Sequence, residues 1–156
     1  MRSLDSWFDE YGASHRHPTN KAIHWVCVPL IMFAALGLLF ALPRPEWFAL
    51  AGPRFGNWAM LVIVLALAWY ALLSWRLALG MLLVLAAMVA AEHLLVRLPW
   101  PAWRSSAAIF VAAWIGQFVG HEIEGRKPSF LKDLAFLLVG PAWLLAAVYR
   151  RLGIAY

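Results

Sequence analysis

The sequence predicts an all-α integral membrane protein, a helical bundle of about four transmembrane helices followed by a C-terminal interfacial or re-entrant helix. Of its 156 residues, 64% are hydrophobic and only 13% are charged, whereas an ordinary soluble domain is about half apolar and about a quarter charged. Four stretches approach the roughly 20 apolar residues that a helix needs to cross a bilayer. The connectors between them contain Pro, Gly and Trp, which are typical of helix breaks and of the membrane interface.

These elements form one membrane domain, residues 1–156, without a linker or an internal repeat. The N-terminal segment 1–22 is amphipathic and lacks the apolar run of a signal peptide, so we expect it to be retained. The expected spans are 23–42, 58–75, 77–96 and 105–120. A polar loop, 121–133, follows the last of them. The last segment, 134–156, has an apolar run interrupted by Gly140-Pro141, which favours an interfacial or re-entrant helix over a fifth crossing.

Four crossings place both termini on one side of the membrane, and that side then holds nine of the 13 Lys and Arg residues. The positive-inside rule makes this side cytoplasmic, in a bacterial inner membrane or the endoplasmic reticulum. The formal charge of +5 is spread beside the apolar segments, which indicates membrane lipids as partners and no nucleic acid. The sequence fixes no oligomeric state.

Two polar blocks that are distant in the sequence meet at this cytoplasmic face. Before the first span lie His15, His17 and His24, and after the fourth span lie His121 and Glu124. Helical spacing puts each of these pairs on one face: Gln117 with His121, His121 with Glu124, Asn20 with His24, and Tyr11 with His15. The topology therefore predicts a cluster of imidazoles and a carboxylate.

This donor set predicts a metal site. Histidine and carboxylate ligands with open positions suit non-haem Fe(II), and an imidazole-rich set also accepts Zn or Cu. Asp133, Gln117 and Asn20 are candidates to hydrogen-bond the rings and fix their tautomers. A single interfacial histidine is more often an ordinary hydrogen-bonded residue, but four of the five histidines fall on one side. The pattern is not the His-Glu-x-x-His of zinc proteases.

Three further features have competing interpretations. His93 lies about 24 Å along the third span from its cytoplasmic end, so Glu92 and His93 are expected to satisfy each other or neighbouring helices, with a metal-ligand role less favoured. Arg126 and Lys127 are either cytoplasmic anchors or the binding site of a substrate carboxylate. The single cysteine, Cys27, is expected to be a buried, inert thiol.

The polar blocks also carry a family resemblance. The residues concerned are Tyr11-x-x-x-His15, Asn20-x-x-x-His24 with Pro29, Trp114-x-x-Gln117-Phe118-x-Gly120-His121-x-x-Glu124-x-x-x-Pro128 with Asp133, and the tail Gly140-Pro141-Ala142-Trp143. Together they resemble the Mpo-like membrane proteins over nearly the whole chain. The resemblance implies an Fe(II)-dependent dioxygenase that performs α-oxidation of 2-hydroxy fatty acids with O2 and shortens the chain by one carbon. Fungal members carry out this reaction during the breakdown of phytosphingosine, a sphingolipid base, at the endoplasmic reticulum.

The resemblance also implies roles for individual residues. It makes His15, His24 and His121 the metal ligands, with Glu124 a less favoured ligand and a catalytic candidate. Tyr11 and Asn20 are candidate substrate-binding residues, together with Arg126 and Lys127. Two other hypotheses remain beside the dioxygenase: a non-enzymatic lipid or proton carrier that uses the His and Glu side chains, and a membrane protein that binds haem through two histidines.

Overall fold

The computed structural model describes residues 2–156, and the side chains of all of these except 53 and 54. Every regular element among the described residues is helical, which confirms the all-α prediction. In chain order the elements are α1 (Leu4–Ala13), α2 (Pro18–Ala41), the 3-10 helix η1 (Glu46–Ala51), α3 (Gly52–Phe55), α4 (Trp58–Leu73), α5 (Trp75–Leu95), α6 (Ala102–Glu124), the 3-10 helix η2 (Ser129–Leu131) and α7 (Phe136–Arg151).

Polar side chains cap the starts of α4 and α5. The Asn57 side chain accepts a hydrogen bond from the backbone N–H of Met60 at the start of α4, and the Ser74 side chain does the same for Leu77 at the start of α5. Such caps satisfy backbone donors that have no partner within the helix. At its C-terminal end, α6 stops at Gly125, which has φ of 68°, a left-handed conformation that favours glycine.

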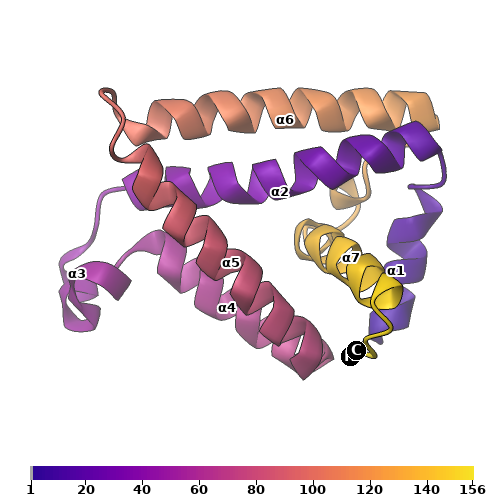
Figure 1. Cartoon of the computed structure of the whole chain (residues 1–156), viewed down its shortest axis with the longest axis horizontal. Helices are drawn as coiled ribbons and strands as arrows, with labels where there is room; N and C mark the ends of the chain where they lie inside the picture. Colours follow the sequence, from indigo (N-terminus) through magenta and orange to yellow (C-terminus); the bar gives the residue numbers. More distant parts are fainter. Residues whose placement is uncertain (1) are drawn as a thin grey trace.

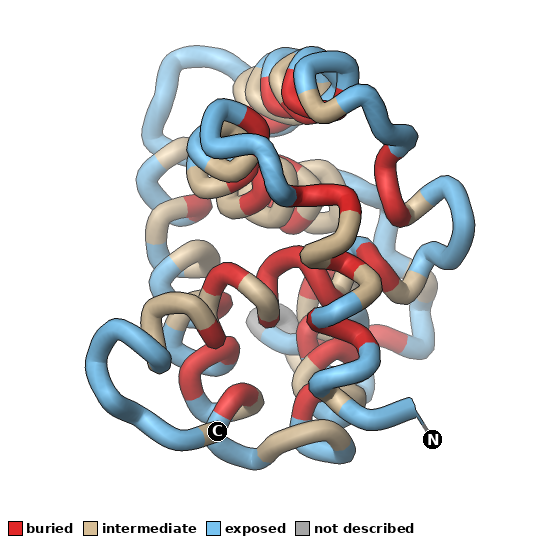
Figure 2. The backbone as a smooth tube through the Cα atoms, turned by 90° about the vertical axis from the view of Figure 1, so that its right-hand side faces the viewer, coloured by how far each residue is buried: buried red, intermediate tan, exposed pale blue. Residues whose placement is uncertain are grey.

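The helices form three pairs. Figure 1 shows α2 and α6 side by side along the long axis, α4 and α5 as an oblique hairpin, and α1 beside α7 at the end where α2 begins. Figure 2 shows buried residues concentrated on the surfaces that face the interior and exposed residues on the outside. Many exposed side chains on the long helices are large and apolar, for example Leu83 at 66% and Ile115 at 61% exposure, as expected for surfaces that face lipid.

Three helices, α2, α5 and α6, are long and apolar enough to cross a membrane. The expected span 58–75 is represented by α4, which has only 16 residues. At 1.5 Å per residue it is about 24 Å long, which is less than the roughly 30 Å of the hydrocarbon layer. The Asn57 and Ser74 caps set its two ends. The fold is therefore a membrane bundle with three full-length helices and a shorter apolar one.

Two boundaries differ from the sequence prediction. The first long helix begins at Pro18, so the end of the segment 1–22 already belongs to α2. The fourth runs to Glu124, so the first turn of the expected loop 121–133 is helical. The first change puts Asn20 on regular helix, and the second puts His121 there.

The ends of the chain lie together with the α4–α5 turn. Arg76 Nη1 donates to the backbone oxygen of Ala155 at 3.1 Å, and the Tyr149 hydroxyl donates to the backbone oxygen of Arg76 at 2.9 Å. The rings of Phe8 and Tyr156 are 6.2 Å apart. An even number of crossings predicts this arrangement, and the side of the membrane stays a prediction.

The C-terminal segment forms α7, a 16-residue helix that contains Pro141. It packs on α1 and α5, and one face of it is buried. Its neighbours cover Val139 and Ala142, each 1% exposed. This explains why a segment with a proline in its middle stays helical: packing on two neighbouring helices stabilises it. Whether it is interfacial or re-entrant in a bilayer stays a prediction.

Candidate metal centre

Three histidines from three segments converge at one end of the bundle. His15 lies in the loop after α1, His24 in the second turn of α2, and His121 in the last turn of α6. They are 1%, 1% and 5% exposed. One potential ligand nitrogen from each lies within 4.8 Å of the other two. The structure thus brings together the three histidines that the sequence placed at one face.

The rings are arranged around a common point. The ring centroids are 4.3 Å apart for His15 and His24, 5.0 Å for His15 and His121, and 4.9 Å for His24 and His121. The three interplanar angles are 79°, 76° and 87°, so the rings are nearly perpendicular to one another. Each imidazole therefore presents an edge, where its nitrogen lone pairs lie, without stacking on another member of the set.

Backbone carbonyls select which nitrogen faces the centre. His15 Nδ1 donates to the Tyr11 carbonyl at 2.6 Å, and His24 Nδ1 donates to the Asn20 carbonyl at 2.9 Å. Holding Nδ1 as the donor leaves Nε2 with its lone pair free, as for a metal-binding histidine. His15 Nε2 and His121 Nδ1 are buried and have no hydrogen-bond partner.

The His15 imidazole is neutral at neutral pH. Burial, with a further contribution from neighbouring His24, lowers the pKa of His15 to about 3. Loss of solvation disfavours the charged form of a base. A neutral ring is the form that binds a metal ion.

Glu124 fixes the loop that carries His15. Its two carboxylate oxygens accept hydrogen bonds from the backbone N–H groups of Arg16 and His17, each at 2.8 Å. One of these oxygens also accepts from Asn20 Nδ2 at 3.1 Å. In the structure, Glu124 thus links α6 to the loop and positions His15. Its predicted roles as a less favoured metal ligand and as a catalytic residue stay predictions.

Asn20 and Gly120 fix the spacing of α2 and α6 at the site. Asn20 is fully buried, and its amide nitrogen donates to the Ser14 carbonyl as well as to Glu124. A Cβ at Gly120 would overlap Asn20 Oδ1. Only glycine permits this close approach of the two helices. Asn20 therefore acts as a support for the cluster, and its predicted contact with substrate stays a prediction.

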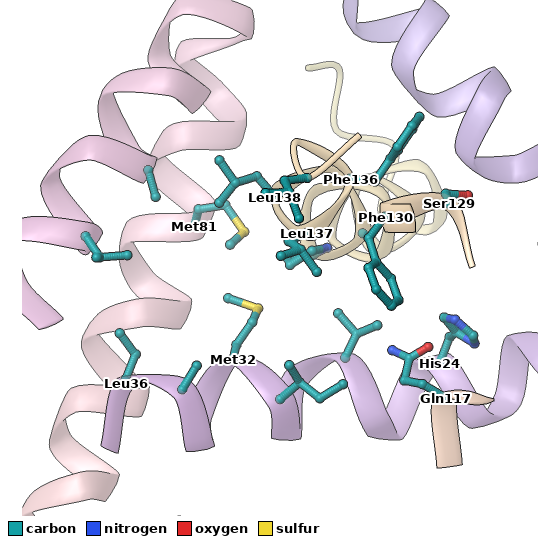
Figure 3. Close-up of a pocket in the computed structure, with 18 of the residues that line it drawn as sticks. His24, Met32, Leu36, Met81, Gln117, Ser129, Phe130, Phe136, Leu137 and Leu138 are labelled. Atoms are coloured by element: carbon teal, nitrogen blue, oxygen red, sulfur yellow. The ribbon is translucent and has the colours of Figure 1, made fainter. Parts of the chain in front are cut away.

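Two other predicted residues lie against the histidines. The Tyr11 ring stacks on His15, with centroids 4.0 Å apart and an angle of 17°, and burial raises the pKa of the Tyr11 phenol so that it stays protonated. Figure 3 shows the Gln117 amide next to His24. Both residues line the cavity described below, and their roles beside a metal stay predictions.

The remaining candidates lie elsewhere. The Asp133 carboxylate is exposed and accepts from the backbone N–H of Ala135 at 2.9 Å, which places it at the start of α7. His17 is the N-cap of α2 and accepts from Thr19. His93 is exposed near the far end of α5, where Nδ1 donates to the Val89 carbonyl of its own helix.

An apolar cavity of about 470 Å³ begins at the three histidines. This volume is in the range of about 300–1,000 Å³ typical of small-molecule sites. Arg126 and Lys127 do not line it. They line a neighbouring cavity of about 540 Å³, which shares Ser129 with the first. Arg126 and Lys127 were predicted to bind the substrate carboxylate, but neither side chain lines the histidine cavity.

The residues that sequence reasoning missed are those that shape this cavity and its border. Ser14 and Ser129 have hydroxyl oxygens 2.6 Å apart, and Ser14 Oγ is 3.3 Å from His15 Nδ1. Phe130 packs on Trp114 with ring centroids 4.7 Å apart. A serine next to a histidine and single aromatic residues are common in sequences, so no local pattern distinguished them.

The site geometry can now be compared with known proteins. Residues 1–152 match the family described as 2-hydroxy-palmitic acid dioxygenase Mpo1-like. The chain belongs to the Mpo1-like family. A relative from Saccharomyces cerevisiae, named 2-hydroxy-palmitic acid dioxygenase MPO1, is 26% identical in an alignment 156 positions long, which covers 98% of this chain and 83% of the relative. No solved structure matches the chain.

The family match confirms the resemblance that the two polar blocks predicted. It covers all three clustered histidines and the residues that support them. Three buried histidines of this arrangement are compatible with a metal cofactor.

Proposed function

We propose that this protein is an Fe(II)-dependent dioxygenase that performs α-oxidation of 2-hydroxy fatty acids. The observation that carries the proposal is the cluster of three buried histidines at one end of a long apolar cavity, in a chain of the Mpo1-like family. In the proposed reaction the bond between the carboxyl carbon and the hydroxyl-bearing carbon breaks. The hydroxyl-bearing carbon becomes the new carboxyl group, dioxygen accepts the electrons, and carbon dioxide and water complete the balance.

The residues present fit a metal ion. His15 Nε2 and His121 Nδ1 are buried without a partner, and a buried polar atom without a partner costs free energy unless a ligand satisfies it. His15, His24 and His121 would hold the ion. Ferrous iron supplies redox chemistry with dioxygen and Lewis acidity when it is bound.

The side chains define how a hydroxy acid would lie. Among the described residues that line the cavity there is no Asp, Glu, Lys or Arg, and Gln117 and Ser129 lie at the histidine end, while the Tyr70 hydroxyl donates to the Leu138 carbonyl. Three neutral imidazoles leave the charge of a divalent ion uncompensated, so an anionic 2-hydroxy carboxylate is the complementary ligand. The hydrocarbon chain would then extend among the apolar residues, which also keep water from the reacting end.

The cavity also has an apolar approach. Leu134 and Leu137 line it and are 72% and 44% exposed, respectively. In a bilayer these leucines would face acyl chains, so a fatty acid can reach the cavity without leaving the lipid phase.

The arrangement argues against the haem hypothesis. A haem would need flat space between the two imidazoles that hold it, whereas here a third imidazole has a ligand nitrogen within 4.8 Å of both others. That third ring occupies space which the macrocycle would need. The carrier hypothesis is separated from the enzyme by measurement of turnover.

The test is reconstitution of the purified full-length protein with Fe(II) under anaerobic conditions, followed by addition of 2-hydroxypalmitate and O2. Mass spectrometry should show an acid one carbon shorter, with a stoichiometric loss of O2. Parallel loading with Zn(II) should give no product, and palmitate without the 2-hydroxyl should not react. Stoichiometric iron binding without product from any 2-hydroxy acid would contradict the proposed activity.

A further inference from the structure

We infer that the apolar cavity is an acyl-chain site whose closed end, formed by Leu36, Ile63 and Leu85, sets the longest straight chain that the protein accepts. The inference rests on the proposed function for the identity of the polar head, but the chain site itself is defined by the cavity. Figure 3 shows the cavity extending from His24 and Gln117 to Leu36, with Met32 and Met81 between them.

The length of the cavity follows from one face of α2. Its lining residues on this helix recur at spacings of three and four, from His24 through Val28 and Met32 to Leu36 at the closed end. Leu39, one turn further, packs against the cluster that forms this end. His24 and Leu36 are separated by 12 residues, or about 18 Å at 1.5 Å per residue. One leaflet of a bilayer has a hydrocarbon depth of about 15 Å, half of roughly 30 Å. A single extended acyl chain of ordinary membrane length therefore matches the cavity.

The closed end is part of the packed interior. Leu36, Ile63 and Leu85 come from α2, α4 and α5, and they are 5%, 6% and 6% exposed. Together with Ala59, which is fully buried, they form one hydrophobic cluster. Side chains from three different helices thus meet across the end of the cavity.

A buried polar side chain, that of Glu92, lies behind this cluster and close to α2. Glu92 lies two turns beyond Leu85 on the same face of α5, and it is 4% exposed. A Cβ at Gly37, the residue after Leu36, would lie 2.7 Å from Glu92 Oε1 and would overlap Ser106 Oγ. The interface of α2 with α5 and α6 therefore has no free space beside Gly37, so a longer chain cannot pass between these helices there.

Chain selection at this site must be steric. Lipid tails are about as apolar as leucine side chains, so moving a chain from the bilayer into the cavity yields little hydrophobic free energy. Extra methylenes forced against a packed cluster are unfavourable. The protein should thus accept all chains up to a limit and discriminate against longer ones by on the order of tenfold or more.

The test changes the closed end and measures the limit. Leu85→Ala and Leu36→Ala should each move the longest accepted substrate upward in a series of unbranched 2-hydroxy acids from decanoate to lignocerate. Leu85→Phe should move it downward. The control is Leu83→Ala, because Leu83 is on the same helix but 66% exposed, and its chain-length profile should equal that of the unaltered protein.

A binding measurement separates this inference from the proposed activity. The same acids without the hydroxyl group are added to the metal-free protein in detergent, and the shift of its melting temperature is recorded. A length limit that moves with Leu85→Ala supports the chain site even if the protein shows no dioxygenase turnover. Active variants whose limits in both assays equal that of the unaltered protein would overturn it. Because Leu85→Phe can fail to fold, the two alanine variants suffice for this decision.

Discussion

The α2–α6 pair carries a buried polar cluster near each end, and the two clusters show what separates a ligand site from a packing contact. At one end Gly120 allows Asn20 and the histidines to come together, and at the other end Gly37 allows Glu92 and Ser106 to approach α2. Both ends contain a buried polar atom without a partner, on His15 and His121 in the first and on Glu92 in the second. A glycine beside a buried ionisable group is therefore common to both.

The difference lies in how many donor atoms converge. At the histidine end three imidazole nitrogens lie within 4.8 Å of one another, and backbone carbonyls hold two of the rings in place. At the Glu92 end the neighbour is Ser106, whose hydroxyl donates to the Ala102 carbonyl of its own helix. Several directed lone pairs suit an ion, whereas a single carboxyl group beside a hydroxyl suits contact between helices.

Loss of any one of the three histidines should abolish the site. His15→Ala, His24→Ala and His121→Ala should each reduce the amount of iron bound and the rate of turnover by more than about 100-fold. Even loss of a residue that only supports a metal ligand reduces metal affinity or activity by about 10- to 100-fold. Metal analysis of protein purified after anaerobic loading provides the measurement. Normal iron content in two of the three variants would show that the cluster does not hold the metal.

Glu124→Gln should weaken the site less than loss of a ligand. A glutamine offers one acceptor oxygen where two backbone N–H groups now bind the two carboxylate oxygens, so the His15 loop should lose its position. We expect about 10- to 100-fold weaker iron binding, measured by titration of the metal-free protein. The control is Glu122→Gln, an exposed neighbour in the same helical turn. A loss as large as that of His121→Ala would instead make Glu124 a ligand.

Gly120→Ala and Gly37→Ala form a matched pair. Each adds one methyl group where a Cβ would overlap a polar side chain, and each should destabilise the protein by about 1–3 kcal/mol. Only Gly120→Ala should also reduce iron binding, because Asn20 holds the loop and the ring of His24. Thermal unfolding and metal analysis of both variants check this. Equal iron loss in both would show that the two ends are coupled.

His17→Ala should have a small effect on stability and none on metal stoichiometry. His17 caps α2 through its ring nitrogen, which accepts from the Thr19 N–H at 3.2 Å, and loss of such a cap costs about 1 kcal/mol. His17→Asn, which keeps a capping acceptor, should restore the melting temperature. Loss of iron in His17→Ala would contradict this role if His17→Asn restored the melting temperature but not the iron content.

His93→Gln should have the smallest effect. The side chain is exposed, and its hydrogen bond is to its own helix, so the expected change in unfolding free energy is within about 0.5 kcal/mol. Iron content should be unchanged. A variant that unfolds normally but lacks iron would move the metal site toward the Glu92 end.

The sequence alone determined the class of the protein and the histidines that cluster at one end of it. Apolar runs of about 20 residues predict membrane helices because an unpaired backbone in lipid is too costly, and the spacing of Gln117, His121 and Glu124 puts them on one helical face. The number of crossings then brought the two polar blocks together. These inferences depend on local periodicity and on topology, which a single sequence contains.

The tertiary structure decided what each polar residue does and where the substrate can lie. Whether Glu124 points to a metal or to the backbone of Arg16 and His17 depends on the path of a loop more than 100 residues away in the chain. The separation of Arg126 and Lys127 from the histidine cavity depends in the same way on how α1, η2 and α7 pack. The cavity itself has walls from α2, α4, α5, α6 and α7. Contacts between distant segments leave no periodic signal in any one of them, so only the assembled fold shows the cavity from which the acyl-chain site is inferred.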